Sequence, residues 1–163
     1  MRFIPRLFIA GGLALCASVA GPVAASQAAP TATIHAVIGI GTWSGGSFGT
    51  PTLAVGAAIN GMATGGGFAI TYPPDVTYPA GSTAVRGTVT CLDVVNGDTA
   101  YITGLVMYAS GPRADIFPVG DYITMGVQAD ALNFNPGQTT SPGPDCGAVT
   151  PNLTLTNGHF FVR

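Results

Sequence analysis

Apolar and polar residues alternate in short runs along the chain after residue 30, and Gly, Pro, Asn or Asp separates one run from the next. A period of two is typical of β-strands with one buried face, whereas no long window shows the 3.6-residue apolar period of a helix. The pattern predicts a long polar loop at 133–152 and seven strands, at residues 31–43, 52–59, 67–72, 84–95, 99–109, 122–129 and 153–162.

Alternation also indicates which residues share a face of a strand. In the first strand the apolar positions are expected to face the core, which leaves His35 facing solvent. In the strand at 84–95, Val85, Val89 and Cys91 are predicted to share a face. Asn96-Gly97 between two apolar runs is the strongest short signal for a β-hairpin. The apolar set of the first strand comprises Ile34, Ala36, Ile38 and Ile40.

Seven or eight strands at this spacing predict an all-β fold, a single small antiparallel β-barrel or sandwich. The pattern leaves both architectures open. Composition favours the same class, because the chain contains 24 glycines and neither Lys nor Glu. Lys and Glu normally cover the exposed faces of helices, while Thr, Val and Gly are typical of strands and turns.

The first 28 residues have the organisation of a signal peptide. Arg2 and Arg6 precede an uncharged apolar run at 7–20, then Gly21-Pro22 and a series of small residues. The run is too short to span a bilayer as a helix. We expect cleavage after Ala25 or Ala28 and a single β-domain over 29–163. A retained membrane anchor and a lipoprotein are the alternatives, although Leu15 is large for the position before a lipidated Cys16.

Removal of the signal leaves three arginines against seven aspartates, a net charge of −4. An acidic domain with scattered arginines is not expected to bind nucleic acid, and no stable membrane insertion is expected after cleavage. A secreted protein, extracellular or in the cell envelope, with a cell-surface or extracellular ligand is predicted instead. In that oxidising location Cys91 and Cys146 are predicted to form a disulfide, with two free buried thiols as the alternative.

Catalytic and metal motifs are weak. Gly45-Gly46-Ser47-Phe48-Gly49 matches the G-x-S-x-G pattern of hydrolases, but a strand rather than a helix is predicted after it. We interpret it as a glycine-rich hairpin loop. His35 and His159 are interpreted as exposed, although pairing of the first and last strands would offer a two-histidine site.

We predict no catalytic residue, cofactor or metal ligand. The polar residues of the hairpin turn leave a calcium site as a minor alternative, although their spacing differs from that of a calcium-binding loop. Those residues are Asp93, Asn96 and Asp98.

Three aromatic residues are the best candidates for ligand binding. Trp43 and Tyr72 lie at predicted strand ends, and Tyr78 lies in the loop that follows Tyr72. Aromatic rings in such places stack on ligands or partner surfaces, or they cap the end of a barrel. Both interpretations remain open.

Most of residues 40–163 resemble small secreted all-β proteins of GC-rich, actinobacterial-type bacteria, and the resemblance is strongest at residues 85–104. In those largely uncharacterised proteins a G-x-V-x-C-L-x-V strand meets an A-x-I-x-G strand over a tight turn, as Gly87–Val94 and Ala100–Gly104 do here. The resemblance implies an exported β-domain and no particular activity. The usual D-N-G after the sixth strand is replaced by Gln128-Ala129-Asp130.

The predicted function is that of a secreted, non-catalytic binding or surface-interaction module. The first alternative is a small secreted hydrolase-like enzyme that uses Ser47 or the histidines. The second is an outer-membrane β-barrel, whose last strand normally ends in an aromatic residue. This chain ends in Val162-Arg163.

Overall fold

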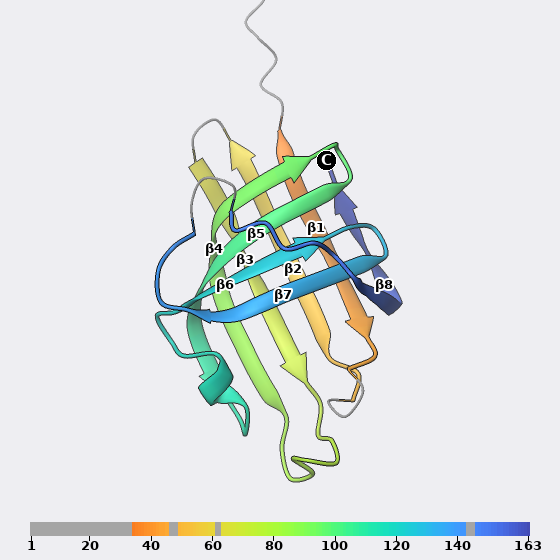
Figure 1. Ribbon diagram of the computed structural model, residues 1–163, viewed down its shortest axis with the longest axis vertical. Coiled ribbons are helices and arrows are strands. Elements are labelled where there is room, and N and C mark those ends of the chain that lie inside the picture. The colour runs from red at the N-terminus through yellow and green to blue at the C-terminus, as the bar shows by residue number, and fades with distance from the viewer. Residues whose placement is uncertain (1–33, 46–48, 61–62, 143–145) are drawn as a thin grey trace, which may run out of the picture. The chain divides into compact units, whose positions relative to one another are not determined.

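The computed structural model describes residues 34–45, 49–60, 63–142 and 146–163, so the predicted signal peptide lies outside the described residues. These residues form a closed barrel of eight antiparallel strands, in which each strand pairs with the next and β8 pairs back with β1 (Figure 1). The all-β prediction is confirmed, and of the two architectures left open the barrel is observed. The strands are β1 His35–Trp43, β2 Thr52–Asn60, β3 Ala63–Tyr72, β4 Thr83–Val95, β5 Thr99–Ser110, β6 Tyr122–Val127, β7 Ala131–Gln138 and β8 Leu153–Val162.

The barrel interior is filled by apolar side chains from alternate strand positions. Phe68 lies across the centre, where a Cβ at either Gly87 or Gly104 would collide with its ring. Glycines on β4 and β5 therefore make room for one large aromatic from β3. The fully buried side chains include Leu53, Ile70, Val85, Ile102, Ile123, Met125, Leu132 and Phe160. Within the described residues, no helix is long and apolar enough to cross a membrane.

The prediction for the face of β1 is wrong. Ile38 and Ile40 are 64% and 56% exposed, and the inward positions hold Val37, Trp43 and two glycines. The reason lies on β8, where Phe160 enters the core against β1 and would collide with a Cβ at Gly39. The isoleucines therefore occupy the outer surface. His35, expected to face solvent, belongs to the inward-facing set and is partly buried.

Strand β7 falls in a region predicted to be a loop. Apart from Phe134, its residues 133–138 are polar or strand-breaking, yet the strand pairs with β6 through a register shift between Tyr122 and Thr124. Pro136 is compatible with this strand because β7 pairs with β8 only at Ala131 and Leu132, so its far edge is open there. Phe134 anchors the strand by packing its ring against Trp43.

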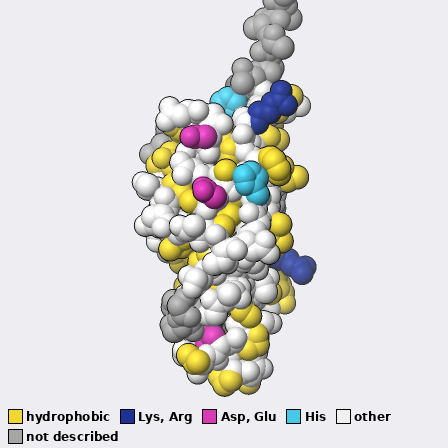
Figure 2. Space-filling view, turned by 90° about the vertical axis from the view of Figure 1, so that its right-hand side faces the viewer, with side chains coloured by type: hydrophobic (Ala, Val, Ile, Leu, Met, Phe, Trp, Pro, Cys, Tyr) yellow, Lys and Arg dark blue, Asp and Glu magenta, His cyan; other side chains and the backbone are white. Residues whose placement is uncertain are grey.

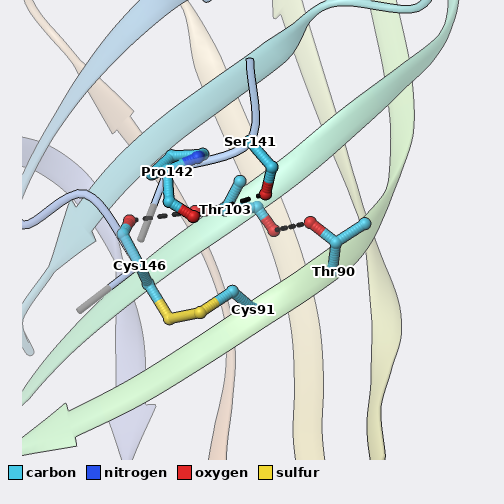
Figure 3. The surroundings of a disulfide bond; sticks show 6 residues. All are labelled: Thr90, Cys91, Thr103, Ser141, Pro142 and Cys146. Carbon is cyan, nitrogen blue, oxygen red and sulfur yellow. Dashed lines mark hydrogen bonds between the residues drawn. A yellow bond between two sulfur atoms is a disulfide. The ribbon is translucent and has the colours of Figure 1, made fainter. Parts of the chain in front are cut away.

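The predicted disulfide between Cys91 and Cys146 is present, with their Cα atoms 5.5 Å apart (Figure 3). A register shift between Val89 and Cys91 changes the alternation of β4, so Leu92 is buried. The prediction that Cys91 shares the face of Val89 is therefore wrong. The bulge directs Cys91 to the outer surface, where Cys146 lies.

Cys146 begins a segment, residues 146–151, that we call the strap. It crosses the outer surface of β5 and β6 before the chain enters β8 (Figure 1). The Thr103 hydroxyl of β5 donates a hydrogen bond of 2.9 Å to the Cys146 carbonyl (Figure 3). The side-chain amide of Asn133 donates a hydrogen bond of 3.2 Å to the Thr150 carbonyl. The strap thus buries outward-facing residues of the sheet.

The predicted hairpin between β4 and β5 is also confirmed. Asn96 and Gly97 have φ angles of 55° and 77°, which are those of a type I′ turn. This turn matches the twist of the two strands it joins, and β4 and β5 pair from Val95 and Thr99 onward.

Candidate functional site

A cavity of about 360 Å³ lies at one end of the barrel, where β1 and β3 end. Its wall is completed by the segment after β5, by β7 and by the first residue of β8, so it draws on parts of the chain more than 100 residues apart. Nearly all lining side chains are apolar. The lining residues are Trp43, Ser44, Gly45, Pro51, Tyr72, Arg113, Ile116, Phe117, Phe134, Pro136 and Leu153.

Four aromatic rings form the frame of this cavity. Trp43 meets Phe134 edge-on with ring centroids 5.6 Å apart, and it meets Tyr72 edge-on at 6.4 Å. Tyr72 in turn lies 5.9 Å from Phe117. Edge-to-face contacts at these distances are favourable and hold each ring in one orientation. The aromatic wall is therefore preorganised.

A buried ion pair closes the cavity on the side of Tyr72. Arg113 and Asp75 place Nη2 and Oδ2 2.5 Å apart, and their side chains are only 3% and 2% exposed. The other Asp75 oxygen accepts the backbone N–H groups of Thr77 and Tyr78 at 2.8 and 3.0 Å. The Arg113 backbone N–H donates to the Thr83 hydroxyl at 3.0 Å. These bonds tie the loop between β3 and β4 to the segment after β5.

The surroundings decide the charge states of this cluster. Burial raises the pKa of Asp75, but hydrogen bonds from Tyr78, Arg113 and Thr77 outweigh it, so the net pKa lies below its ordinary value. Burial also raises the pKa of Tyr72 well above its usual range, opposed only in part by the charge of Arg113. At neutral pH Asp75 is therefore ionised and the Tyr72 hydroxyl stays protonated.

Two of the three aromatic residues proposed from the sequence, Tyr72 and Tyr78, lie beside Arg113. Its guanidinium lies 5.6 Å from the Tyr72 ring centroid and 4.7 Å from that of Tyr78, within the range of cation–π contacts. Trp43 and Tyr72 are buried and line the cavity. Tyr78 is 37% exposed and lines a separate surface hollow with Pro79 and Pro112, so the structure brings two of the three into the cavity.

Three important members of the site were missed in the sequence. Phe134 fell in the predicted polar loop. An isolated Phe among polar residues was a signal that this segment packs against another part of the chain. Arg113 and Phe117 lie in a short connection with a 3₁₀ turn at Ala114–Ile116, where strand periodicity gives no information. The sequence signal for Arg113 was its rarity, because residues 29–163 contain only three arginines.

The catalytic alternatives do not assemble in the described residues. Ser47 lies outside them, and the first element after Gly49 is strand β2, not the helix that the hydrolase motif requires. Strands β1 and β8 do pair, but His159 lies opposite Ile40, five residues along β1 from His35. At about 3.3 Å per residue that is roughly 16 Å. Histidine side chains lie apart from each other on the side of the molecule shown in Figure 2.

Acidic and metal-ligating groups are scattered in the part of the chain that the structure describes, where no three His, Cys, Asp or Glu side chains gather. Asp98 of the hairpin turn accepts the hydroxyl of its neighbour Thr99 at 2.9 Å. The turn is explained by this bond and by the conformations of Asn96 and Gly97.

No protein-family model, no curated protein and no solved structure matches this chain. The resemblance of residues 85–104 to secreted β-proteins therefore stays a prediction. The function has to be argued from the chemistry of the site.

Proposed function

We propose that this protein is a secreted, non-catalytic binding module that takes a small, largely apolar ligand containing a ring in the cavity at the end of its barrel. The observation that carries the proposal is the aromatic frame of Trp43, Tyr72, Phe117 and Phe134 around about 360 Å³. Small-molecule sites are typically apolar hollows of about 300–1,000 Å³ with a few polar groups that set orientation.

The apolar wall favours an apolar ligand because water inside it would find few hydrogen-bond partners. At about 30 Å³ per molecule, the space corresponds to roughly ten waters. Their displacement by a ring that contacts Trp43 and Phe134 recovers water–water hydrogen bonds and gains aromatic contacts. Polar groups among the lining residues are the Ser44 and Tyr72 hydroxyls and the Arg113 guanidinium, which is ion-paired with Asp75.

Binding is favoured over catalysis by the titratable groups of the wall. Burial keeps the Tyr72 hydroxyl protonated at neutral pH, and a general acid or base works best with a pKa near the working pH. The secreted location rests on the N-terminal sequence, and the disulfide is compatible with it.

The test uses the chain's single tryptophan, Trp43, which lies in the cavity wall. Titration with the neutral probe N-phenyl-1-naphthylamine is expected to quench Trp43 emission and to saturate at one probe per protein. Ile116 lines the cavity but is 44% exposed, so Ile116→Asp places a carboxylate at the site without disturbing the core. We expect its dissociation constant to rise by about tenfold or more, because a charge is desolvated by the probe.

The matched control is Val119→Asp. Val119 is 64% exposed, lies three residues from Ile116 and does not line the cavity. The Val119→Asp variant should bind the probe with the same dissociation constant as the parent protein. Absence of saturable quenching, or equal weakening by both aspartates, would show that the cavity is not the binding site.

A further inference from the structure

The outer face of β8, β1, β2 and β3 is uncharged and includes exposed large apolar side chains; we call it the bare face. Strands β1, β2 and β3 contain no Asp, Glu, Lys or Arg. Ile38, Ile40 and Phe161 point outward and are 64%, 56% and 67% exposed. Figure 2 views the molecule from the side of β8 and β1 and shows apolar side chains along its right-hand edge. Contiguous exposed apolar surface of this kind marks an interaction site.

The strand register divides the bare face into a ridge and a trench. One row across the strands reads Phe161, Ile38, Gly56 and Gly67, and the next reads His159, Ile40, Ala54 and Ala69. The large side chains therefore lie on β8 and β1, and the small ones on β2 and β3. A shallow hollow lined by Ile38, Gly56, Ala58 and Gly65 marks the start of the trench.

Two glycines of the trench, Gly56 and Gly65, are not required by the barrel, whereas a Cβ at Gly67 would lie 3.2 Å from the Gly87 carbonyl oxygen. A Cβ at Gly56 or at Gly65 would meet no atom within 4 Å, and neither residue has the positive φ that favours glycine. Glycine in a strand costs about 0.5–1 kcal/mol relative to alanine, so a reason outside the barrel is needed. A close approach by another surface is such a reason.

We propose that the bare face is a homodimer interface in which the ridge of each copy fills the trench of the other. A two-fold axis running along the strands between β1 and β2 places β1 of one copy over β2 of its partner and β8 over β3. Each row then meets itself, with Ile38 over Gly56 and Phe161 over Gly67. Such an isologous contact closes after two copies.

The charges at the edges of the face fit the same arrangement. Arg86 on β4 is exposed and pairs with Ala69 of β3, so it extends the second row past the trench. Asp98 lies beyond the ridge, in a hollow that it shares with His159 and Phe161. Figure 2 shows acidic side chains on one flank and arginine on the other. The two-fold axis brings the basic edge of one copy to the acidic edge of the other.

The size of the face is of the order that a dimer needs. Four strands spaced about 4.8 Å apart, with nine or ten residues of about 3.3 Å each, cover roughly 19 Å by 30 Å, or about 570 Å² in projection. The accessible area of side chains on such a face exceeds its projection. A stable interface buries about 800 Å² per partner, which is of the same order as this projected area.

The experiment is sedimentation equilibrium of protein purified from cells that express the full chain, across a wide range of concentration. We expect a monomer–dimer equilibrium. Gly56→Leu fills the trench at a position with open space and Ile38→Asp charges the ridge, so each should raise the dissociation constant by about a hundredfold. Arg86→Asp should raise it by about threefold, because the pair lies at the rim.

Met107→Asp is the matched control, because Met107 is 56% exposed on β5, outside the bare face. It should dimerise normally, and thermal unfolding should show that every variant folds. A monomer at all concentrations, or dimers that Gly56→Leu and Ile38→Asp leave intact, would overturn the proposal. So would co-sedimentation of a monomer with phosphatidylcholine vesicles, which would assign the face to lipid. These readouts are independent of probe binding in the cavity.

Discussion

Gly126 and Gly56 both lie on the outer surface of the barrel, one on β6 and the other on β2, but the constraints on them differ. A Cβ at Gly126 would collide with the carbonyl oxygen of Val149 in the strap. A Cβ at Gly56 would meet nothing within 4 Å. Gly126 is explained by a contact inside the molecule, whereas Gly56 has no such explanation in the described residues.

The same contrast extends to the surrounding faces. Outward-facing Thr103 and Thr124 on the strap side are completely buried, and their hydroxyls are hydrogen-bonded. On the bare face Ile38 and Ile40 remain more than half exposed. The chain thus covers one outer face of the barrel with the strap. It leaves the other face, which is uncharged and carries exposed isoleucines, uncovered. Intramolecular packing accounts for the first face, and association accounts for the second.

The largest expected effect comes from releasing the strap. Replacing Cys91 and Cys146 together by Ser removes a crosslink that closes a loop of 55 residues, which stabilises the fold by about 4 kcal/mol in the chain-entropy model. Urea unfolding should therefore show a large fall in the free energy of unfolding. Reduction of the parent protein should reproduce this fall and leave the double variant unchanged. A loss below about 1 kcal/mol would mean that the strap is held by its hydrogen bonds alone.

The second prediction concerns the strap without touching the disulfide. Gly126→Ala pushes a methyl group into the Val149 carbonyl, and overpacking of this kind costs about 1–3 kcal/mol. The measurement is again urea unfolding, with the slope of the transition as a check that the unfolded state is unchanged. A neutral Gly126→Ala would show that the strap moves aside at little cost.

The two faces also show how far the sequence alone determines the structure. Alternation and the Asn96-Gly97 turn predicted the strands and the hairpin because both are local properties. Alternation on β1 could not tell inside from outside, because the choice depends on Phe160, more than a hundred residues away. The same holds for the cavity. Trp43 and Tyr72 were predicted as candidates from their places at strand ends, whereas Phe134 joins them only through pairing of β7 with β6.

A third, smaller effect is expected at acid pH, at the ion pair that closes the cavity. The pKa of Asp75 is lowered by folding, so its contribution to stability is present above the unfolded value of 3.8 and is lost as pH falls through the folded value. Unfolding followed between pH 5 and pH 2 should show this loss, and Asp75→Asn should reduce the slope. An unchanged slope in Asp75→Asn would assign the acid sensitivity to other carboxylates.

The smallest effect is expected from Gly56→Ala, and it separates the two faces most clearly. The added methyl group enters open space in a strand with ordinary φ, so the monomer should gain about 0.5 kcal/mol through the restricted unfolded chain. The same methyl group raises the floor of the trench beneath Ile38 of the partner, so the dimer should weaken. Urea unfolding at a concentration where the protein is monomeric, together with sedimentation equilibrium, measures the two changes separately. A loss of monomer stability would place the requirement for glycine within the barrel, as for Gly126. A higher free energy of unfolding of the monomer, accompanied by weaker dimerisation, would show that Gly56 serves the interface at a cost to the stability of the fold.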